Sequence, residues 1–75
     1  MSFQVCFKKV EDIVNFVSEV AEAPFHIDAC CGSYIVDAKS VLGMMSIGIA
    51  RNMELKLYTD DNVGELGQVI EAYAA

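Results

Sequence analysis

Two hydrophobic periods alternate along this chain, and their order is the feature that most constrains its fold. Alternation of apolar and polar residues at every second position predicts four half-buried strands, in residues 3–7, 25–30, 34–37 and 53–58. Recurrence of apolar residues at spacings of three and four predicts three amphipathic helices, in residues 10–21, 41–47 and 63–73. The predicted order is therefore β-α-β-β-α-β-α.

Capping and breaking residues mark the expected ends of the helices. Pro24 ends the first helix, because proline cannot continue the hydrogen-bond ladder. Ser40 is expected to cap the second helix, since its hydroxyl can accept from the free N–H groups of the first turn. Asn62 and Glu65 have the spacing of a capping box for the third helix. We expect that helix to fray near Ala74–Ala75.

Strands with one polar face need cover on one side only. The sequence therefore predicts an α+β fold, a two-layer open-faced sandwich with three helices on one face of a four-stranded antiparallel sheet. With 75 residues, the chain is expected to be a single domain spanning residues 1–75. A domain of this size has no second lobe to enclose a catalytic cleft, which excludes most enzyme architectures.

The charge balance argues against two classes of partner. Eleven acidic residues against five basic ones give a net charge of −6, which repels nucleic acid and anionic lipid surfaces. The longest stretch without a charged residue, Ser40–Ala50, has 11 residues and is shorter than the roughly 18 needed to enter a bilayer as a span. The first residues lack the order of a secretion signal, so we expect a cytoplasmic protein.

The three cysteines, Cys6, Cys30 and Cys31, are expected to be reduced thiols. Their odd number and the adjacent pair suit neither a disulfide framework nor the ligand spacing of a zinc site. Other acidic and glycine residues show no spacing typical of a metal site or a phosphate-binding loop. We therefore predict neither a bound metal nor a cofactor.

The segment from Val36 to Ile49, VDAKSVLGMMSIGI, resembles the regulatory-serine segment of a known family. That family is HPr, the histidine-containing phosphocarrier protein of the bacterial phosphoenolpyruvate-sugar phosphotransferase system. Lys-Ser, the glycine three residues later, Met-Ser and Gly-Ile all fall in register with it, and Phe16–Val17 agrees as well. The resemblance implies a sheet order of 1-4-2-3 with all helices on one face.

The resemblance does not extend to the phosphocarrier site. In the family, the first strand leads into a loop with a Gly-Leu-His-Ala/Thr-Arg-Pro motif, whose histidine accepts the phosphoryl group. Here Phe7 continues through Lys8 and Lys9 into the first helix without a histidine, arginine or proline. Transfer through phosphohistidine needs an imidazole nucleophile beside helix N–H donors and a cation. We therefore expect a protein that is not an enzyme and does not carry phosphohistidine.

Ser40 and His26 remain to be considered as candidate phosphate acceptors. In HPr of many Gram-positive bacteria a dedicated kinase phosphorylates the serine at the position of Ser40, so the resemblance implies a regulatory phosphorylation site. The simpler interpretation is an ordinary helix cap. His26 is the only histidine, and strand alternation places it on the solvated face beside Asp28, where we expect it to have no role.

The second helix is apolar on more than one side. Met44 and Ile47 can face the sheet, which leaves other apolar residues of the helix outward, because each residue turns the helix by about 100°. The protein-binding residues predicted from this helix and its start are Lys39, Val41, Leu42 and Met45. In the resembled family this helix meets the first enzyme of the phosphotransferase chain and a catabolite-control repressor.

The sequence thus favours an HPr-like regulator that binds protein partners of the phosphotransferase or catabolite-control type. One alternative is a divergent phosphocarrier in sugar uptake that uses His26 or a cysteine. Another is a homodimer, joined through the second helix or through the edge strand at residues 34–36. Cover of the second helix by the last one is a further alternative.

Overall fold

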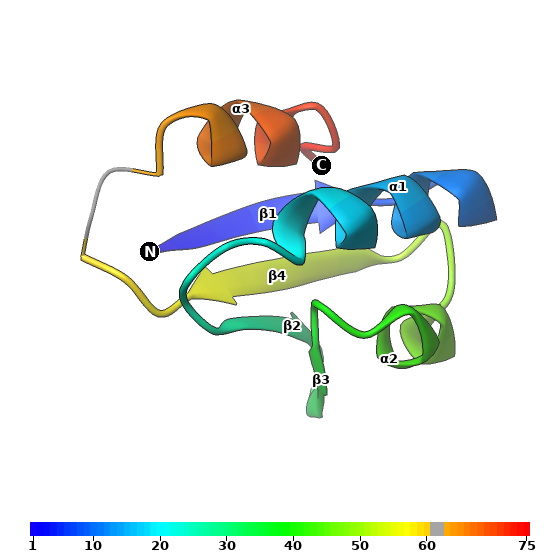
Figure 1. Ribbon diagram of the computed structural model, residues 1–75. Coiled ribbons are helices and arrows are strands. Elements are labelled where there is room, and N and C mark those ends of the chain that lie inside the picture. The colour runs from blue at the N-terminus through cyan, green and yellow to red at the C-terminus, as the bar shows by residue number, and fades with distance from the viewer. Residues whose placement is uncertain (61–62) are drawn as a thin grey trace.

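The computed structural model describes residues 1–60 and 63–75 and has the predicted element order. Figure 1 shows four strands with helices packed against them. The elements are β1 (Ser2–Cys6), α1 (Val10–Val20), β2 (Ile27–Cys31), β3 (Tyr34–Asp37), α2 (Val41–Ile47), β4 (Asn52–Leu57) and α3 (Glu65–Glu71). The predicted α+β class and element order are confirmed.

The four strands form one antiparallel sheet in the order β1-β4-β2-β3. Leu55 of β4 is the partner of Phe3 on β1 and of Ala29 on β2, so the apolar positions of neighbouring strands lie side by side on one face. Glu54 and Lys56, the neighbours of Leu55 along β4, lie on the other face, opposite the helices that the structure describes (Figure 1). The order 1-4-2-3 implied by the resemblance is confirmed.

The three helices bury their apolar stripes against that one face of the sheet (Figure 1). The stripe of α1 is the longest, because its spacing of three and four residues matches the helical period over the whole element. The buried helical residues are Ile13, Phe16, Val17 and Val20 of α1, Met44 and Ile47 of α2, and Ile70 of α3. The predicted two-layer sandwich is therefore correct.

Turn geometry explains why β3 has the predicted ends. Gly32 and Ser33 join β2 to β3, and Gly32 has a φ of 61°. Two-residue hairpin loops need such a positive φ, which glycine adopts without a steric penalty. The ends of other elements differ by one or two residues: β2 begins at Ile27, although the carbonyl of His26 still accepts from Tyr58 N–H at 3.0 Å.

The third helix departs most from the prediction. It begins at Glu65 after Gly64, two residues later than expected. Asn62 of the predicted capping box lies outside the described residues. The helix ends at Glu71, before Tyr73, which the apolar spacing had placed inside it.

The prediction that residues 74–75 fray is wrong, because they pair with the outer side of β1. Cys6 N–H donates to the Tyr73 carbonyl at 2.9 Å, and Ala75 N–H donates to the Gln4 carbonyl at 3.1 Å. The Tyr73 ring lies 4.9 Å from the Phe7 ring and 5.8 Å from the Phe16 ring, measured between centroids. These contacts satisfy backbone groups that an edge strand would otherwise expose.

Within residues 1–60 and 63–75, no helix has the length and apolar character that crossing a bilayer requires.

Candidate functional site

The outward side of α2 exposes three apolar side chains, which we call the α2 surface: Val41, Leu42 and Met45. Leu42 is 83% exposed, while Val41 is 38% and Met45 is 41% exposed. Met44 and Ile47, on the opposite side of the helix, are buried. The predicted division of α2 into an inward and an outward side is confirmed, and α3 does not cover it.

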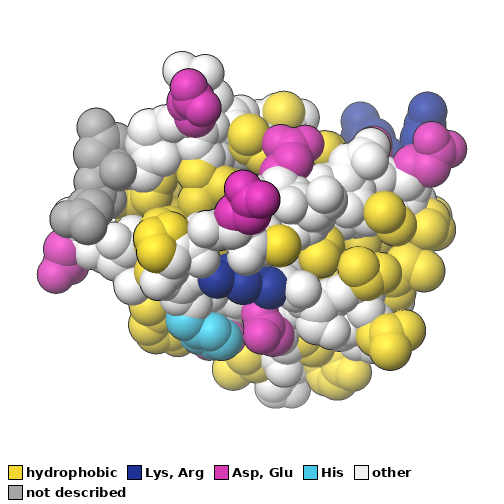
Figure 2. Space-filling view, in the orientation of Figure 1, with side chains coloured by type: hydrophobic (Ala, Val, Ile, Leu, Met, Phe, Trp, Pro, Cys, Tyr) yellow, Lys and Arg dark blue, Asp and Glu magenta, His cyan; other side chains and the backbone are white. Residues whose placement is uncertain are grey.

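The structure extends this apolar surface to residues that the sequence did not single out. Val10 and Val14 of α1 and Ile49 after α2 are all exposed. Helices α1 and α2 pack beside each other, and Ala50 N–H donates to the Phe7 carbonyl at 2.7 Å, which brings Ile49 to the start of α1. Figure 2 shows hydrophobic side chains gathered where these two helices meet. The surface is thus made by two helices from distant parts of the chain.

Ser40 forms the predicted cap of α2. Its Oγ accepts from Gly43 N–H at 3.1 Å, and its backbone has the extended conformation of an N-cap residue. Glycine at position 43 lets the helix approach β3, because a Cβ there would lie 3.3 Å from the Cβ of Val36. The Ser40 hydroxyl is half-buried at the start of the α2 surface.

Lys39 precedes Ser40, and its ammonium group points toward the end of α1 and not toward the α2 surface. Its Nζ donates to the Ala23 carbonyl at 2.6 Å, just beyond the last turn of α1, and its backbone N–H donates to Asp37 Oδ1 at 2.9 Å. An ammonium group is favoured there, because the carbonyls at a helix C-terminus carry partial negative charge. The structure therefore gives Lys39 an intramolecular contact on the side of the molecule where α1 ends.

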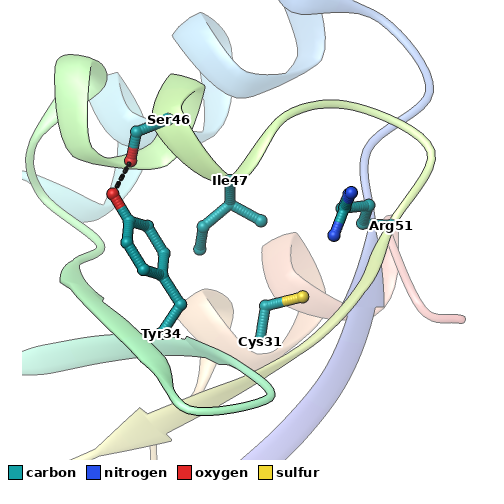
Figure 3. Close-up of a pocket in the computed structure, with 5 residues that line it drawn as sticks. All are labelled: Cys31, Tyr34, Ser46, Ile47 and Arg51. Atoms are coloured by element: carbon teal, nitrogen blue, oxygen red, sulfur yellow. Dashed lines mark hydrogen bonds between the residues drawn. The ribbon is translucent and has the colours of Figure 1, made fainter.

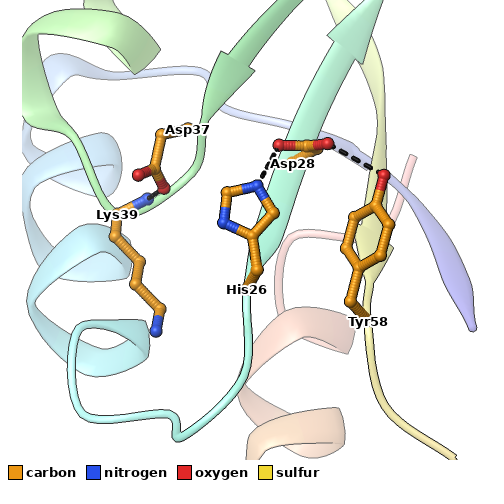
Figure 4. A network of polar contacts seen from close by, with 5 residues as sticks. All are labelled: His26, Asp28, Asp37, Lys39 and Tyr58. Carbon is orange, nitrogen blue, oxygen red and sulfur yellow. Dashed lines mark hydrogen bonds and ion pairs between the residues drawn. The ribbon is translucent and has the colours of Figure 1, made fainter.

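His26 belongs to a polar cluster on the open face of the sheet. Its Nε2 is paired with Asp28 Oδ1 at 2.5 Å, and Tyr58 donates from its hydroxyl to Asp28 Oδ2 at 2.9 Å (Figure 4). The hydrogen bond to Asp28, followed by the negative charge of that carboxylate, raises the pKa of Tyr58 above its usual value. Sequence reasoning found His26 and Asp28 but missed Tyr58, which only the pairing of β2 with β4 brings alongside.

The start of α1 has backbone N–H groups and two lysines nearby but lacks the imidazole nucleophile that phosphohistidine transfer needs. Lys9 is the N-cap residue of α1 and makes no side-chain cap, and Lys8 and Lys9 are both exposed. The single histidine of the sequence lies on the open face, with the sheet between it and the helices. Within the described ranges, no three histidine, cysteine, aspartate or glutamate side chains form a group that could hold a metal ion.

Comparison with known proteins assigns no family. The chain matches no protein-family model, and no curated protein matches it significantly in sequence. The relationship to HPr therefore remains a prediction from residues 36–49.

Proposed function

We propose that this protein is an HPr-like cytoplasmic regulator that binds other proteins through the α2 surface and does not carry phosphohistidine. The observation that supports the proposal is the exposure of Leu42 between Val41 and Met45. Burying one such side chain against a partner contributes about 1.5–3 kcal/mol. Leucine and methionine side chains also adapt to partners of different shape.

The proposed partners are proteins of the phosphotransferase or catabolite-control type, which the resemblance of residues 36–49 implies. Ser40 is the proposed regulatory phosphorylation site. A phosphate on its Oγ would place about 1.5–2 negative charges beside Val41, where an apolar contact would have to be desolvated. The phosphoryl oxygens could also accept from the N–H groups of the first turn of α2, where Ser40 Oγ now accepts from Gly43 N–H.

Direct binding to purified partners tests the proposal. The partners are the first enzyme of the phosphotransferase chain and a catabolite-control repressor, and calorimetry measures the Kd. Leu42→Asp should weaken binding by about tenfold or more, because it places a charge in the centre of the contact. Gln4→Asp is the matched control, since it adds the same charge at an exposed position of the open sheet face. Absence of binding, or equal loss in both variants, would contradict the proposal.

A divergent phosphocarrier is the second candidate, and one observation favours it. Asp28 holds Nε2 of His26, which leaves Nδ1 as the free nucleophilic nitrogen of an exposed ring. The same carboxylate opposes it, because it would repel a phosphoryl dianion. Acid-labile label transferred from phosphoenolpyruvate through the first enzyme, and lost in His26→Ala, would establish this function instead.

A homodimer is the third candidate. It would use the α2 surface or the outer side of β3, where Tyr34 and Ile35 are exposed. The net charge of −6 opposes it, because two copies repel each other. Light scattering at several protein concentrations distinguishes a dimer from a monomer.

A further inference from the structure

A pocket of about 320 Å³ lies between the β2–β3 hairpin, the end of α2 and the loop that leads into β4. The residues that line it are Cys31, Tyr34, Ser46, Ile47 and Arg51 (Figure 3). One is a cation, one is a thiol and two carry hydroxyls, and none is acidic. It is separate from the α2 surface and does not depend on the function proposed above.

Strand alternation directs the Cys31 thiol into this pocket. Cys31 is the last residue of β2, two positions after the buried Ala29, so both lie on the helix side of the sheet. Cys31 is half-buried, and Figure 3 shows its sulfur pointing toward the side of the pocket where Arg51 lies. Cys30 lies on the opposite face, where its strand partner is the acidic residue Glu54. The two adjacent thiols therefore have opposite electrostatic surroundings.

The loop before β4 brings Arg51 to the mouth of the pocket. Gly48 has a φ of 96°, and Ala50 has a φ of 61° and is held by its N–H bond to the Phe7 carbonyl. Glycine adopts a positive φ readily, whereas at Ala50 this conformation persists only because the surrounding contacts hold it. In the part of the chain that the structure describes, the Arg51 guanidinium has no ion pair or hydrogen bond. Its donors are free to bind an anion.

The opposite wall of the pocket supplies hydroxyl groups. The Tyr34 hydroxyl donates to Ser46 Oγ at 3.1 Å, and the Ser46 hydroxyl donates to the Gly43 carbonyl at 2.6 Å. This chain fixes both side chains and leaves the Tyr34 oxygen able to accept a further hydrogen bond. An amide N–H of a small ligand is a suitable donor for it, while Ile47 offers apolar contact.

We propose that Cys31 is a site of reversible mixed-disulfide formation with small carboxylate-bearing disulfides of the glutathione type, which Arg51 holds by a carboxylate. The Cys31 thiol loses its proton to water, and its sulfur attacks one sulfur of the ligand's disulfide. A bond forms between the two sulfurs and the ligand's own S–S bond breaks. The departing sulfur leaves as a thiolate with the electron pair and is reduced, while Cys31 is oxidised to the mixed disulfide.

Single-cysteine variants test this proposal. The Cys6→Ser/Cys30→Ser protein keeps Cys31, and the Cys6→Ser/Cys31→Ser protein keeps Cys30. Each is mixed with oxidised glutathione, and intact mass follows adduct formation. Cys31 should react at least about fivefold faster than Cys30. Attraction between the Arg51 guanidinium and a ligand carboxylate about 4 Å away is worth about 1 kcal/mol in water, which corresponds to a fivefold factor in rate.

Arg51→Gln in the protein that keeps Cys31 separates anion binding from simple access to the thiol. The variant should lose the fivefold advantage with oxidised glutathione but react at an unchanged rate with the uncharged dipyridyl disulfide. Equal rates at Cys30 and Cys31 would overturn the proposal, as would an equal change with both reagents. If a double variant fails to fold, the wild-type protein and Arg51→Gln are each treated with oxidised glutathione instead. Tandem mass spectrometry then locates the modified cysteine and measures the rate of adduct formation at Cys31 and at Cys30.

Discussion

Ser40 holds the first turn of α2 through one hydrogen bond, from Gly43 N–H to its Oγ. We expect Ser40→Ala to lower the free energy of unfolding by about 1 kcal/mol, because it leaves a helix N–H without a partner. Urea denaturation measures the change. A seven-residue helix has few other backbone bonds to compensate for it.

Ser40→Asp is the control for this cap. Its carboxylate can accept from the same N–H, so the variant should stay within about 0.5 kcal/mol of the wild type. If Ser40→Ala is as stable as the wild type, the cap does not contribute to folding. The hydrogen bond from Gly43 N–H would then make no measurable contribution to stability.

The hydrogen bond between Tyr58 and Asp28 predicts a pH dependence. Because the folded state raises the pKa of Tyr58, it favours the neutral phenol. The contribution of this bond to stability is fully present below pH about 10, the usual tyrosine pKa, and is lost as the pH rises through the higher pKa of the folded state. Ultraviolet absorbance should show Tyr58 ionising above pH 10.

Asp28→Asn tests whether the Asp28 carboxylate causes the raised pKa of Tyr58. Without the carboxylate, the ionisation midpoint of Tyr58 should fall toward pH 10, since the acceptor loses its charge. Tyr58→Phe identifies which part of the absorbance change belongs to this residue. An unchanged midpoint in Asp28→Asn would contradict the assignment of the shift to Asp28.

At the scale of elements, the contact of Tyr73 with the core joins α3 to β1. Its ring packs against Phe7 and Phe16, and its carbonyl accepts from Cys6 N–H. We expect Tyr73→Ala to lower the free energy of unfolding by about 2–4 kcal/mol, because it removes an aromatic ring from a three-ring cluster. Thermal and urea denaturation both measure this loss.

Tyr73→Phe is the matched control, since it keeps the ring and the backbone hydrogen bond. It should stay close to the wild type in stability. If Tyr73→Ala also stays close, residues 73–75 would not be part of the cooperative fold, and the sequence-based expectation of fraying would regain support.

The elements that the sequence predicted well are those whose ends depend on local chemistry. Gly32 fixes the hairpin and Ser40 fixes the start of α2, and both elements have the expected bounds there. The expectation failed where an end depends on a distant partner. Apolar spacing predicted that Tyr73 lies inside a helix. The spacing of neighbouring residues contains no information about β1, whose outer side pairs with residues 73–75.

The candidate site shows the same division. Helical spacing alone predicted the outward position of Leu42, since it requires only the period of one helix. The contact of Lys39 with Ala23 depends on the path of the chain between α1 and β2. Arg51 and Cys31 line one pocket only because the loop before β4 returns past the hairpin. No local pattern in the sequence contains these relations.

At the scale of the whole molecule, uncompensated negative charge dominates the electrostatics. The net charge is −6, and the described residues contain one ion pair, between His26 and Asp28. The molecule measures 29 × 24 × 20 Å, which is no larger than the Debye length of about 30 Å at 0.01 M salt. At low salt, each carboxylate therefore repels nearly all the others.

Raising the salt concentration should stabilise the fold. At 0.15 M the Debye length falls to about 8 Å, so only neighbouring charges still interact. We expect the free energy of unfolding to rise by about 0.5–1 kcal/mol between 0.01 and 0.15 M sodium chloride, because the folded state holds the carboxylates closer together than the unfolded chain does. Urea denaturation at the two concentrations measures the difference, and potassium chloride should give the same result.

Neutralising three acidic residues tests whether repulsion between carboxylates causes the salt dependence. Glu19, Glu22 and Glu71 are exposed and lie at or near the ends of α1 and α3, where helix carbonyls disfavour negative charge. Replacing all three by glutamine halves the net charge, so the variant should be more stable at low salt and should gain about half as much from added salt. A wild type that loses stability when salt is added would instead show that attractive charge contacts outweigh the repulsion.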